Sequence, residues 1–274
     1  MKLGAIVKST YQRESCYNAY ELQNFLVQED AMSVFVRFAM VIQKYCALDR
    51  EYRRDVVSLF MFNPDAKLLD LGCGNGDFTM KVAQKICTSH IYGVDVVAES
   101  VSQARAIGIN CITADLNDRF PFEDASFDVI CANQVLEHLS DTDGFIKEIR
   151  RLLKPDGYAV ISTPNLASWS CIAFLLLDWQ PYGVEVSDDF FWAGRPHTQA
   201  EEKMGGTMPQ HRRIFVLRAL KELLQYHNFV LDKYIGSGLR PLPAPLARIF
   251  IKSMTRRADI ITVRILKTSI RKET

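Results

Sequence analysis

The spacing of apolar residues changes character near residue 60. Up to about Leu59, apolar side chains recur every three or four positions, and neither Gly nor Pro occurs between Ala5 and Asn63, which predicts helices over residues 11–59. Beyond residue 66, short apolar runs alternate with helical segments. Such runs suit strands of a parallel sheet that helices cover on both faces. The pattern therefore predicts an α/β fold with a doubly wound sheet.

Individual elements follow from this alternation. The expected strands cover residues 67–72, 91–96, 111–116, 127–133, 157–164, 229–236 and 259–267. The expected helices cover residues 78–86, 99–106, 142–153, 214–226 and a segment that ends near Ser253.

Residues 165–212 interrupt the alternation. This stretch is too long for an ordinary connection, which favours an insertion that covers the active site or binds substrate. Its aromatic residues either form a small core of their own or line the acceptor site: Trp169, Trp179, Tyr182, Phe190, Phe191 and Trp192. We expect a helical cap over residues 1–65 and a main domain over 66–274, with the insertion acting as a lid.

Composition is typical of a globular chain. Of the 274 residues, 48% are hydrophobic and 24% are charged, which suffices for a large core. The longest apolar stretch near the middle, Cys171–Leu177, is too short to span a membrane, and the first residues lack the apolar core of an export signal. The seven cysteines show no CxxC pair and no metal-ligand spacing. These features predict a protein of the reducing cytoplasm.

Charge is balanced overall but uneven along the chain. The net charge is +1, which argues against a general nucleic-acid binder. Residues 212–274 contain 14 Lys and Arg against 4 Asp and Glu. Either a solvated, ion-paired surface or attraction to an anionic substrate or membrane explains this basic segment. The segment Arg248–Arg257 would suit an anionic bilayer surface.

A glycine-rich loop directly follows the first expected strand. The stretch LLDLGCGNGDF, residues 68–78, places glycines at alternate positions, where positive φ or close approach of a ligand requires them. It does not match GxGxxG, the usual signature for a pyrophosphate. Asp70 and Asp77 flank the glycines, so we expect the entrance of the pocket to carry negative charge. Such a loop would repel a diphosphate and attract a ligand with an ammonium and a sulfonium.

These residues resemble a known family. LLDLGCGNG is similar to the first motif of class I S-adenosylmethionine-dependent methyltransferases, and GVDV, ADLNDRFPFEDASFDVICANQVLEHL and RLLKPDGYAVISTPN resemble its later motifs in order. The similarity covers residues 66–164, with weaker matches further on. It implies a Rossmann-like, mostly parallel seven-stranded sheet of order 3-2-1-4-5-7-6 with strand 7 antiparallel.

The resemblance also implies a cofactor site. Asp95, 19 residues after Gly76, would hold the ribose hydroxyls, while Asp115 and the Leu116 amide would bind the adenine. The full set of expected cofactor residues is Asp70, Gly72, Cys73, Gly74, Gly76, Asp95, Val96, Asp115, Leu116, Asn133 and Gln134. Alternatives for single residues stay open: Asp95 as a helix cap, Asp115 as a turn acid, and Asp70 as an acceptor for the loop amides.

Two histidines are candidates for proton transfer. A hydroxyl acceptor needs a base, and imidazole titrates near neutral pH. His138 follows the fourth strand and His211 ends the insertion, although each could instead serve packing. O-methyltransferases of ubiquinone biosynthesis carry a similar ExxEH stretch associated with a divalent metal. Here Gln134 replaces its first acid, and an amide is a weaker ligand for a hard cation, so we predict no metal.

The favoured interpretation is a methyltransferase that uses S-adenosylmethionine and yields S-adenosylhomocysteine. We expect the acceptor to be a hydroxyl oxygen of a small hydrophobic or lipid-linked metabolite, with peripheral contact to an anionic membrane. No nucleic-acid acceptor is expected, because the DPPY or NPPY signature for a flipped base is absent. Other interpretations are C- or N-methylation, a binding module without catalysis, and a nicotinamide oxidoreductase.

Overall fold

A computed structural model describes residues 48–187, 190, 193–195, 211–240, 242 and 244–267, and residues Tyr45–Thr274 form one compact unit. The described strands are β1 (Lys67–Leu71), β2 (His90–Asp95), β3 (Asn110–Thr113), β4 (Phe127–Asn133), β5 (Leu153–Pro164), β6 (Phe229–Ser237) and β7 (Ile260–Lys267). The described helices are α4 (Leu48–Val57), α5 (Asp77–Ile86), α6 (Ala98–Ala106), α7 (Thr142–Leu152), α8 (Trp169–Leu176), α10 (Leu217–Tyr226) and α11 (Ala244–Phe250), with 3-10 turns η1 (Leu136–His138) and η2 (Thr255–Arg257).

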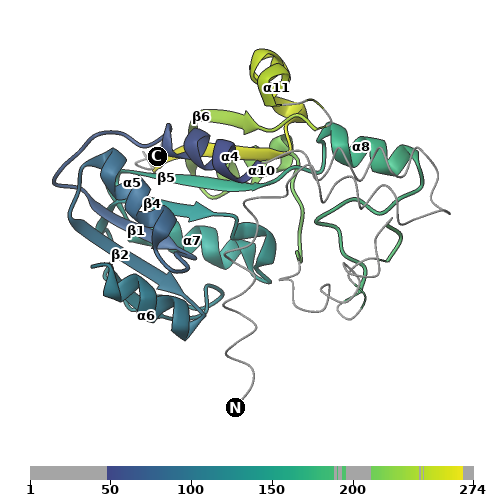
Figure 1. Ribbon diagram of the computed structural model, residues 1–274. Helices are drawn as coiled ribbons and strands as arrows, with labels where there is room; N and C mark the ends of the chain where they lie inside the picture. The colour runs from purple at the N-terminus through teal and green to yellow at the C-terminus, as the bar shows by residue number, and fades with distance from the viewer. Residues whose placement is uncertain are drawn as a thin grey trace, which may run out of the picture. The chain divides into compact units, whose positions relative to one another are not determined.

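The strands form one sheet in the order β3-β2-β1-β4-β5-β7-β6. Figure 1 labels β2, β1, β4, β5 and β6 of this sheet. Strands β1 to β5 pair in parallel, and β7 pairs antiparallel with both β5 and β6. The carboxyl ends of β1, β2, β4 and β5 therefore meet at one edge. This confirms the expected α/β class, the strand order and the antiparallel seventh strand.

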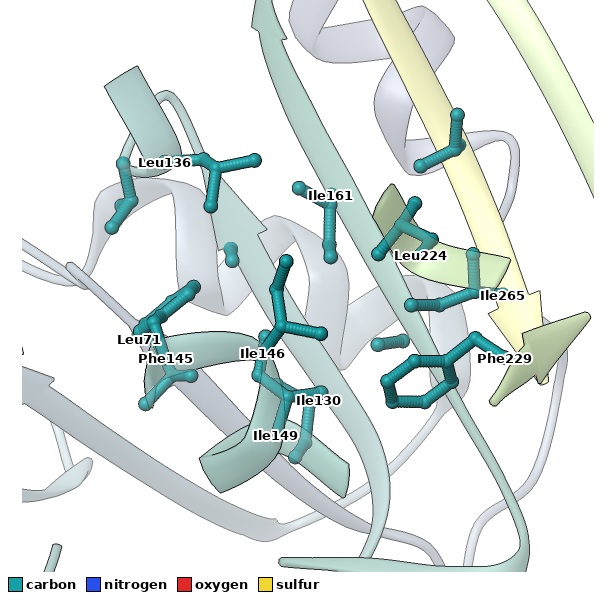
Figure 2. Packing of buried hydrophobic residues seen from close by; sticks show 14 of the residues in the cluster. Leu71, Ile130, Leu136, Phe145, Ile146, Ile149, Ile161, Leu224, Phe229 and Ile265 are labelled. Atoms are coloured by element: carbon teal, nitrogen blue, oxygen red, sulfur yellow. The ribbon is translucent and has the colours of Figure 1, made fainter. Parts of the chain in front are cut away.

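Alternation along the strands divides the core into two layers. On β1, Leu69 and Leu71 point into a cluster with α7 and α10, whereas Leu68 packs with α4, α5 and α6. Figure 2 shows the first cluster, in which Phe145, Ile146 and Ile149 of α7 lie against the sheet. Helices α4 and α5 lie in front of the sheet in Figure 1. Both faces are covered, as the apolar runs predicted.

The structure differs from the expected elements in several places, and β5 begins at Leu153 rather than at residue 157. Strand β3 ends at Thr113, so residues 114–116 form a loop. Helix α10 begins at Leu217 because Phe215 forms a bridge with Asn165 and stays extended. Residues 169–176 of the insertion, for which no element was predicted, form helix α8, where the side chain of Ser168 accepts a hydrogen bond from the backbone N–H of Cys171.

Helix α4 packs on the sheet domain. Tyr52 and Val56 belong to the cluster that contains α5 and α6, and the Ser237 hydroxyl of β6 donates to the carboxylate of Asp55 at 2.8 Å. The rest of the expected helical cap, residues 1–47, lies outside the described residues. Among the helices that the structure describes, none combines the length and apolar character needed to cross a bilayer.

Candidate active site

The glycine loop connects β1 to α5 at the carboxyl edge of the sheet. Gly72, Gly74 and Gly76 have φ values of +80°, +53° and +87°, so each adopts the conformation that glycine tolerates best. The backbone N–H groups of Gly72 and Cys73 donate to the carbonyl of Val94 at 2.8 and 3.1 Å. These bonds fasten the start of the loop to β2.

Asp95 links the loop to the end of β2. One carboxylate oxygen accepts from the backbone N–H of Gly74 at 2.8 Å, and the other accepts from that of Val97 at 2.9 Å. The carboxylate is partly exposed, and the neighbouring Val96 is largely exposed. Asp95 thus lies beside the glycines, where the resemblance requires an acid, and it holds the loop in shape.

Asp70 lies beneath the loop and does not line its entrance, so of the two acids expected there only Asp77 is exposed. Its side chain is buried, and one oxygen accepts from the Thr79 hydroxyl of α5 at 2.6 Å. Burial raises the pKa of Asp70 to about 6. Its other carboxylate oxygen is also buried.

The Cys73 side chain turns away from the edge. Its sulfur lies 3.2 Å from that of Cys111 on β3, and burial raises the pKa of both thiols. A Cβ at Gly93 would lie 2.7 Å from the Cys73 sulfur, so the glycine makes room for this pair. Only the backbone of Cys73 is therefore left to contact a ligand on the loop.

Asp115 and Leu116 occupy the loop after β3. The Asp115 carboxylate accepts from the backbone and side-chain nitrogens of Asn117 at 2.9 and 2.8 Å, and these bonds lower its pKa. This is the turn role considered for Asp115, and it leaves the side chain exposed. A Cβ at Gly72 would lie 3.8 Å from the Leu116 side chain, which brings this loop next to the glycine loop.

Asn133 is the last residue of β4 and Gln134 follows it, and both side chains form hydrogen bonds with Ser162 of β5. The Ser162 hydroxyl of β5 donates to the Asn133 amide oxygen at 2.6 Å, and the Asn133 nitrogen is 3.4 Å from the Tyr52 hydroxyl. Gln134 has a φ of +56° and donates from its side chain to Ser162 at 3.2 Å. Their hydrogen bonds run to β5 and α4, so the structure gives both residues a part in shaping the edge.

The structure brings His138 and His211 together. The backbone N–H groups of Arg212 and Arg213 donate to the carbonyl of Glu137 at 2.7 and 3.1 Å, which holds the end of the insertion against η1. The two imidazole rings consequently lie 4.8 Å apart, centroid to centroid. Burial lowers the pKa of His211 below the usual imidazole value, although Glu185 acts in the opposite direction.

Glu137 is a buried acid beneath this pair. Its side chain is 1% exposed, and it accepts from the Thr163 hydroxyl of β5 at 2.9 Å. The second carboxylate oxygen has no hydrogen-bond partner among the residues described. Burial raises the pKa of Glu137 to about 7, because a carboxylate loses its hydration there.

Glu137, His138 and His211 also form a set of potential metal ligands. Each offers one ligand atom, and these atoms lie within 4.8 Å of one another. One carboxylate with two imidazoles suits a divalent transition metal, so the residues fit such an ion. A bound cation would make an acceptor hydroxyl more acidic. The prediction of no metal took Gln134 into account but not the approach of His211, and it stays a prediction.

Several residues of this region were not predicted from the sequence. Thr163, Glu185 and Arg195 were not candidates, and Glu137 was noted only as part of a motif. An acid between Leu136 and Leu139 is a readable signal for Glu137, because an acid in an apolar run needs a buried partner or a task. For the others we find no comparable signal. Phe191, Trp192 and part of the insertion lie outside the described residues.

Comparison with known proteins also identifies methyltransferases. A family model described as a methyltransferase domain matches residues 45–234. The ubiquinone biosynthesis O-methyltransferase of Bartonella tribocorum is 30% identical over 158 residues, which cover 54% of this chain and 61% of that protein. Phosphoethanolamine N-methyltransferase 1 of Arabidopsis thaliana is 32% identical over 157 residues, 52% of this chain and 32% of that protein.

The fold has solved counterparts. A Haloferax volcanii complex between the Trm112 methyltransferase activator and its putative methyltransferase contains a chain that aligns with a TM-score of 0.55. The alignment covers 87% of this chain and 99% of that chain at 16% identity. Since this identity is low, the match concerns the fold. The chain spans about three fifths or less of the curated relatives described above.

Proposed function

The chain belongs to the methyltransferase-domain family, and on that premise we propose that it is a class I, S-adenosylmethionine-dependent methyltransferase acting on a hydroxyl oxygen of a small hydrophobic or lipid-linked acceptor. The observation that best supports this proposal is the shared edge of the sheet. The glycine loop and Asp95 lie at the ends of β1 and β2, and the His138–His211 pair lies beyond the ends of β4 and β5.

The residues would divide the work between binding and proton removal. The donor supplies a methyl group that its sulfonium already activates, so the protein contributes chiefly alignment. The open backbone at Gly74 and the carboxylate of Asp95 would hold the donor, with Asp70 below. His211 or His138 would take the proton of the acceptor hydroxyl as the oxygen bonds to the methyl carbon. The products are the methylated oxygen, S-adenosylhomocysteine and a protonated imidazole.

Calorimetry tests the cofactor assignment. We expect S-adenosylhomocysteine to bind and NAD to give no measurable heat. Asp95→Ala should weaken binding by about 100-fold, because charge-assisted hydrogen bonds contribute about 1.5–3 kcal/mol each. Asp156→Ala removes an exposed carboxylate from β5 and serves as the matched control. Unchanged affinity in Asp95→Ala would refute the role of this residue.

Turnover tests the transfer to oxygen. Candidate hydroxyl acceptors would be screened for release of S-adenosylhomocysteine. We expect His138→Gln or His211→Gln to lower kcat by about 10²-fold or more, the usual contribution of a general base. His90→Gln, at the exposed start of β2, is the control. Binding without turnover on any acceptor would favour a non-catalytic module, and full activity in both variants would return the two histidines to structural roles.

A further inference from the structure

A buried ion pair lies inside the insertion. The side chains of Glu185 and Arg195 are 2% and 0% exposed, and a guanidinium nitrogen of Arg195 lies 3.2 Å from one Glu185 oxygen. Arg195 also donates to the backbone carbonyls of Gln180 and Pro181 at 3.1 and 2.8 Å. Two charges withdrawn from water need such compensation. Arg195 thus joins two parts of the insertion, because it binds Glu185 and the backbone of residues 180 and 181.

The other oxygen of Glu185 faces His211. It accepts from the backbone N–H of His211 at 3.3 Å and lies 3.6 Å from the ring nitrogen Nδ1. A Cβ at Gly183 would lie 2.9 Å from the same nitrogen, so the glycine leaves room for the ring. The backbone N–H of Gly183 donates to Glu185 at 3.0 Å. The carboxylate thus meets both the main chain and the Nδ1 edge of His211.

His211 is therefore held from two sides. Glu185 holds it from the insertion, while the carbonyl of Glu137 binds the two backbone N–H groups that follow it. The distance of 3.6 Å to Nδ1 is longer than a hydrogen bond. Such contacts in catalytic sites are often long before substrate binds and shorten in the complex. A carboxylate at one nitrogen of an imidazole favours the tautomer that carries its proton there.

We propose that Glu185 is a positioning residue that keeps the proton of neutral His211 on Nδ1, so that Nε2 is the nitrogen that accepts a proton from the acceptor. This inference rests on the proposed function, in which His211 is a base. If Glu185 had a purely structural role, its carboxylate would only neutralise Arg195 and would not affect the tautomer of His211. The two roles separate when the charges of the ion pair are removed one at a time.

The test measures the tautomer of His211 in the free protein. Protein with ¹⁵N-labelled histidine would be studied by long-range ¹H–¹⁵N correlation NMR at about pH 8, above the usual imidazole pKa of about 6.5. The signals lost in His211→Gln identify the residue. Arg195→Met keeps the carboxylate of Glu185 and removes the cation. The double variant Glu185→Gln/Arg195→Met removes both charges, so no buried charge is left unpaired.

We expect wild type and Arg195→Met to carry the proton on Nδ1 and the double variant to lose that preference. Circular dichroism and thermal unfolding would verify that each variant is folded. The same tautomer in all three proteins, or its loss already in Arg195→Met, would overturn the proposal. Because the experiment needs neither acceptor nor cofactor, its outcome is independent of whether methyl transfer is ever observed. A protein without turnover but with this tautomer pattern would contradict only the proposed function.

Discussion

Gly72 and Gly74 both have positive φ but face different surroundings. A Cβ at Gly72 would lie 2.5 Å from the Val135 side chain, so packing inside the protein demands glycine there. A Cβ at Gly74 would meet no described atom within 4 Å. The backbone of Gly74 therefore borders open space at the edge of the sheet. We infer that glycine at position 74 leaves room for a ligand, whereas glycine at position 72 is required by packing in the fold.

Replacing these glycines separates the two purposes. Gly74→Ala should cost about 1–2 kcal/mol of folding free energy from its left-handed backbone, yet weaken S-adenosylhomocysteine binding by more than about tenfold. Gly72→Ala should destabilise the fold more strongly. Urea unfolding and calorimetry provide the two measurements. Gly108→Ala, with φ +93° and similarly open surroundings in an exposed turn, is the matched control. Wild-type affinity in Gly74→Ala would contradict this assignment.

We expect the buried carboxyl of Asp70 to make cofactor affinity depend on pH. In the free protein its carboxyl has a pKa of about 6, so below that value it is mostly protonated. A ligand with an ammonium group favours the ionised form, and binding at low pH must therefore release a proton. We expect affinity for S-adenosylmethionine to rise from about pH 5 to about pH 7 and then level off.

Calorimetry across this pH range measures the effect. Asp70→Asn should bind less tightly at about pH 7 and lose most of the pH dependence, because an amide does not titrate in this range. Asp156→Asn, on an exposed carboxyl, should behave as wild type. If the wild-type affinity stayed constant from about pH 5 to about pH 7, Asp70 would have no contact with the cationic part of the ligand.

At the scale of elements, strands were predicted more accurately than the insertion. Apolar runs such as those of β1 and β4 are bounded by polar residues and glycines, and their limits agree with the structure within a few residues. Helix α8 was missed although Ser168 and the apolar residues after it form a readable helix start. The unusual composition of residues 165–212 hid that local signal.

Helices α8 and α11 present apolar side chains to solvent. On α8, Leu175 and Leu176 are 58% and 82% exposed, and on α11, Ile249 is 69% exposed. Because β5 and β6 run in the same direction, both helices start beyond the same edge of the sheet. The exposed cations Lys252 and Arg256 follow α11. Apolar side chains next to cations suit an anionic bilayer. The side chain of Arg248 lies outside the described residues.

Pelleting with vesicles tests this surface. At low salt we expect the protein to sediment with phosphatidylglycerol vesicles and not with phosphatidylcholine vesicles. Lys252→Glu/Arg256→Glu should weaken the association by about tenfold or more, since each cation contributes about 1 kcal/mol. Lys81→Glu/Lys85→Glu reverses two exposed charges on α5 as a control. No enrichment on anionic vesicles would remove the membrane proposal.

At the scale of the whole molecule, the sheet could be predicted from the sequence, but the contacts between segments far apart in the chain could not. The strand order came from the resemblance, and the apolar periodicity supports the same class of fold. The approach of His211 to His138 depends on backbone bonds from Arg212 and Arg213 to Glu137, far away in the chain. The contact of Glu185 with His211 likewise depends on how the insertion folds back. No local pattern records such contacts, because they arise only after the chain is packed.

The place of β7 between β5 and β6 has a consequence for synthesis on the ribosome. Among the strands that the structure describes, β6 pairs with β7 alone, and β7 is the later of the two to be translated. At roughly 5–20 residues per second, the edges of β5 and β6 that β7 later occupies stay unpaired for some seconds. During that interval a chaperone or a neighbouring nascent chain competes for the gap that β7 eventually fills.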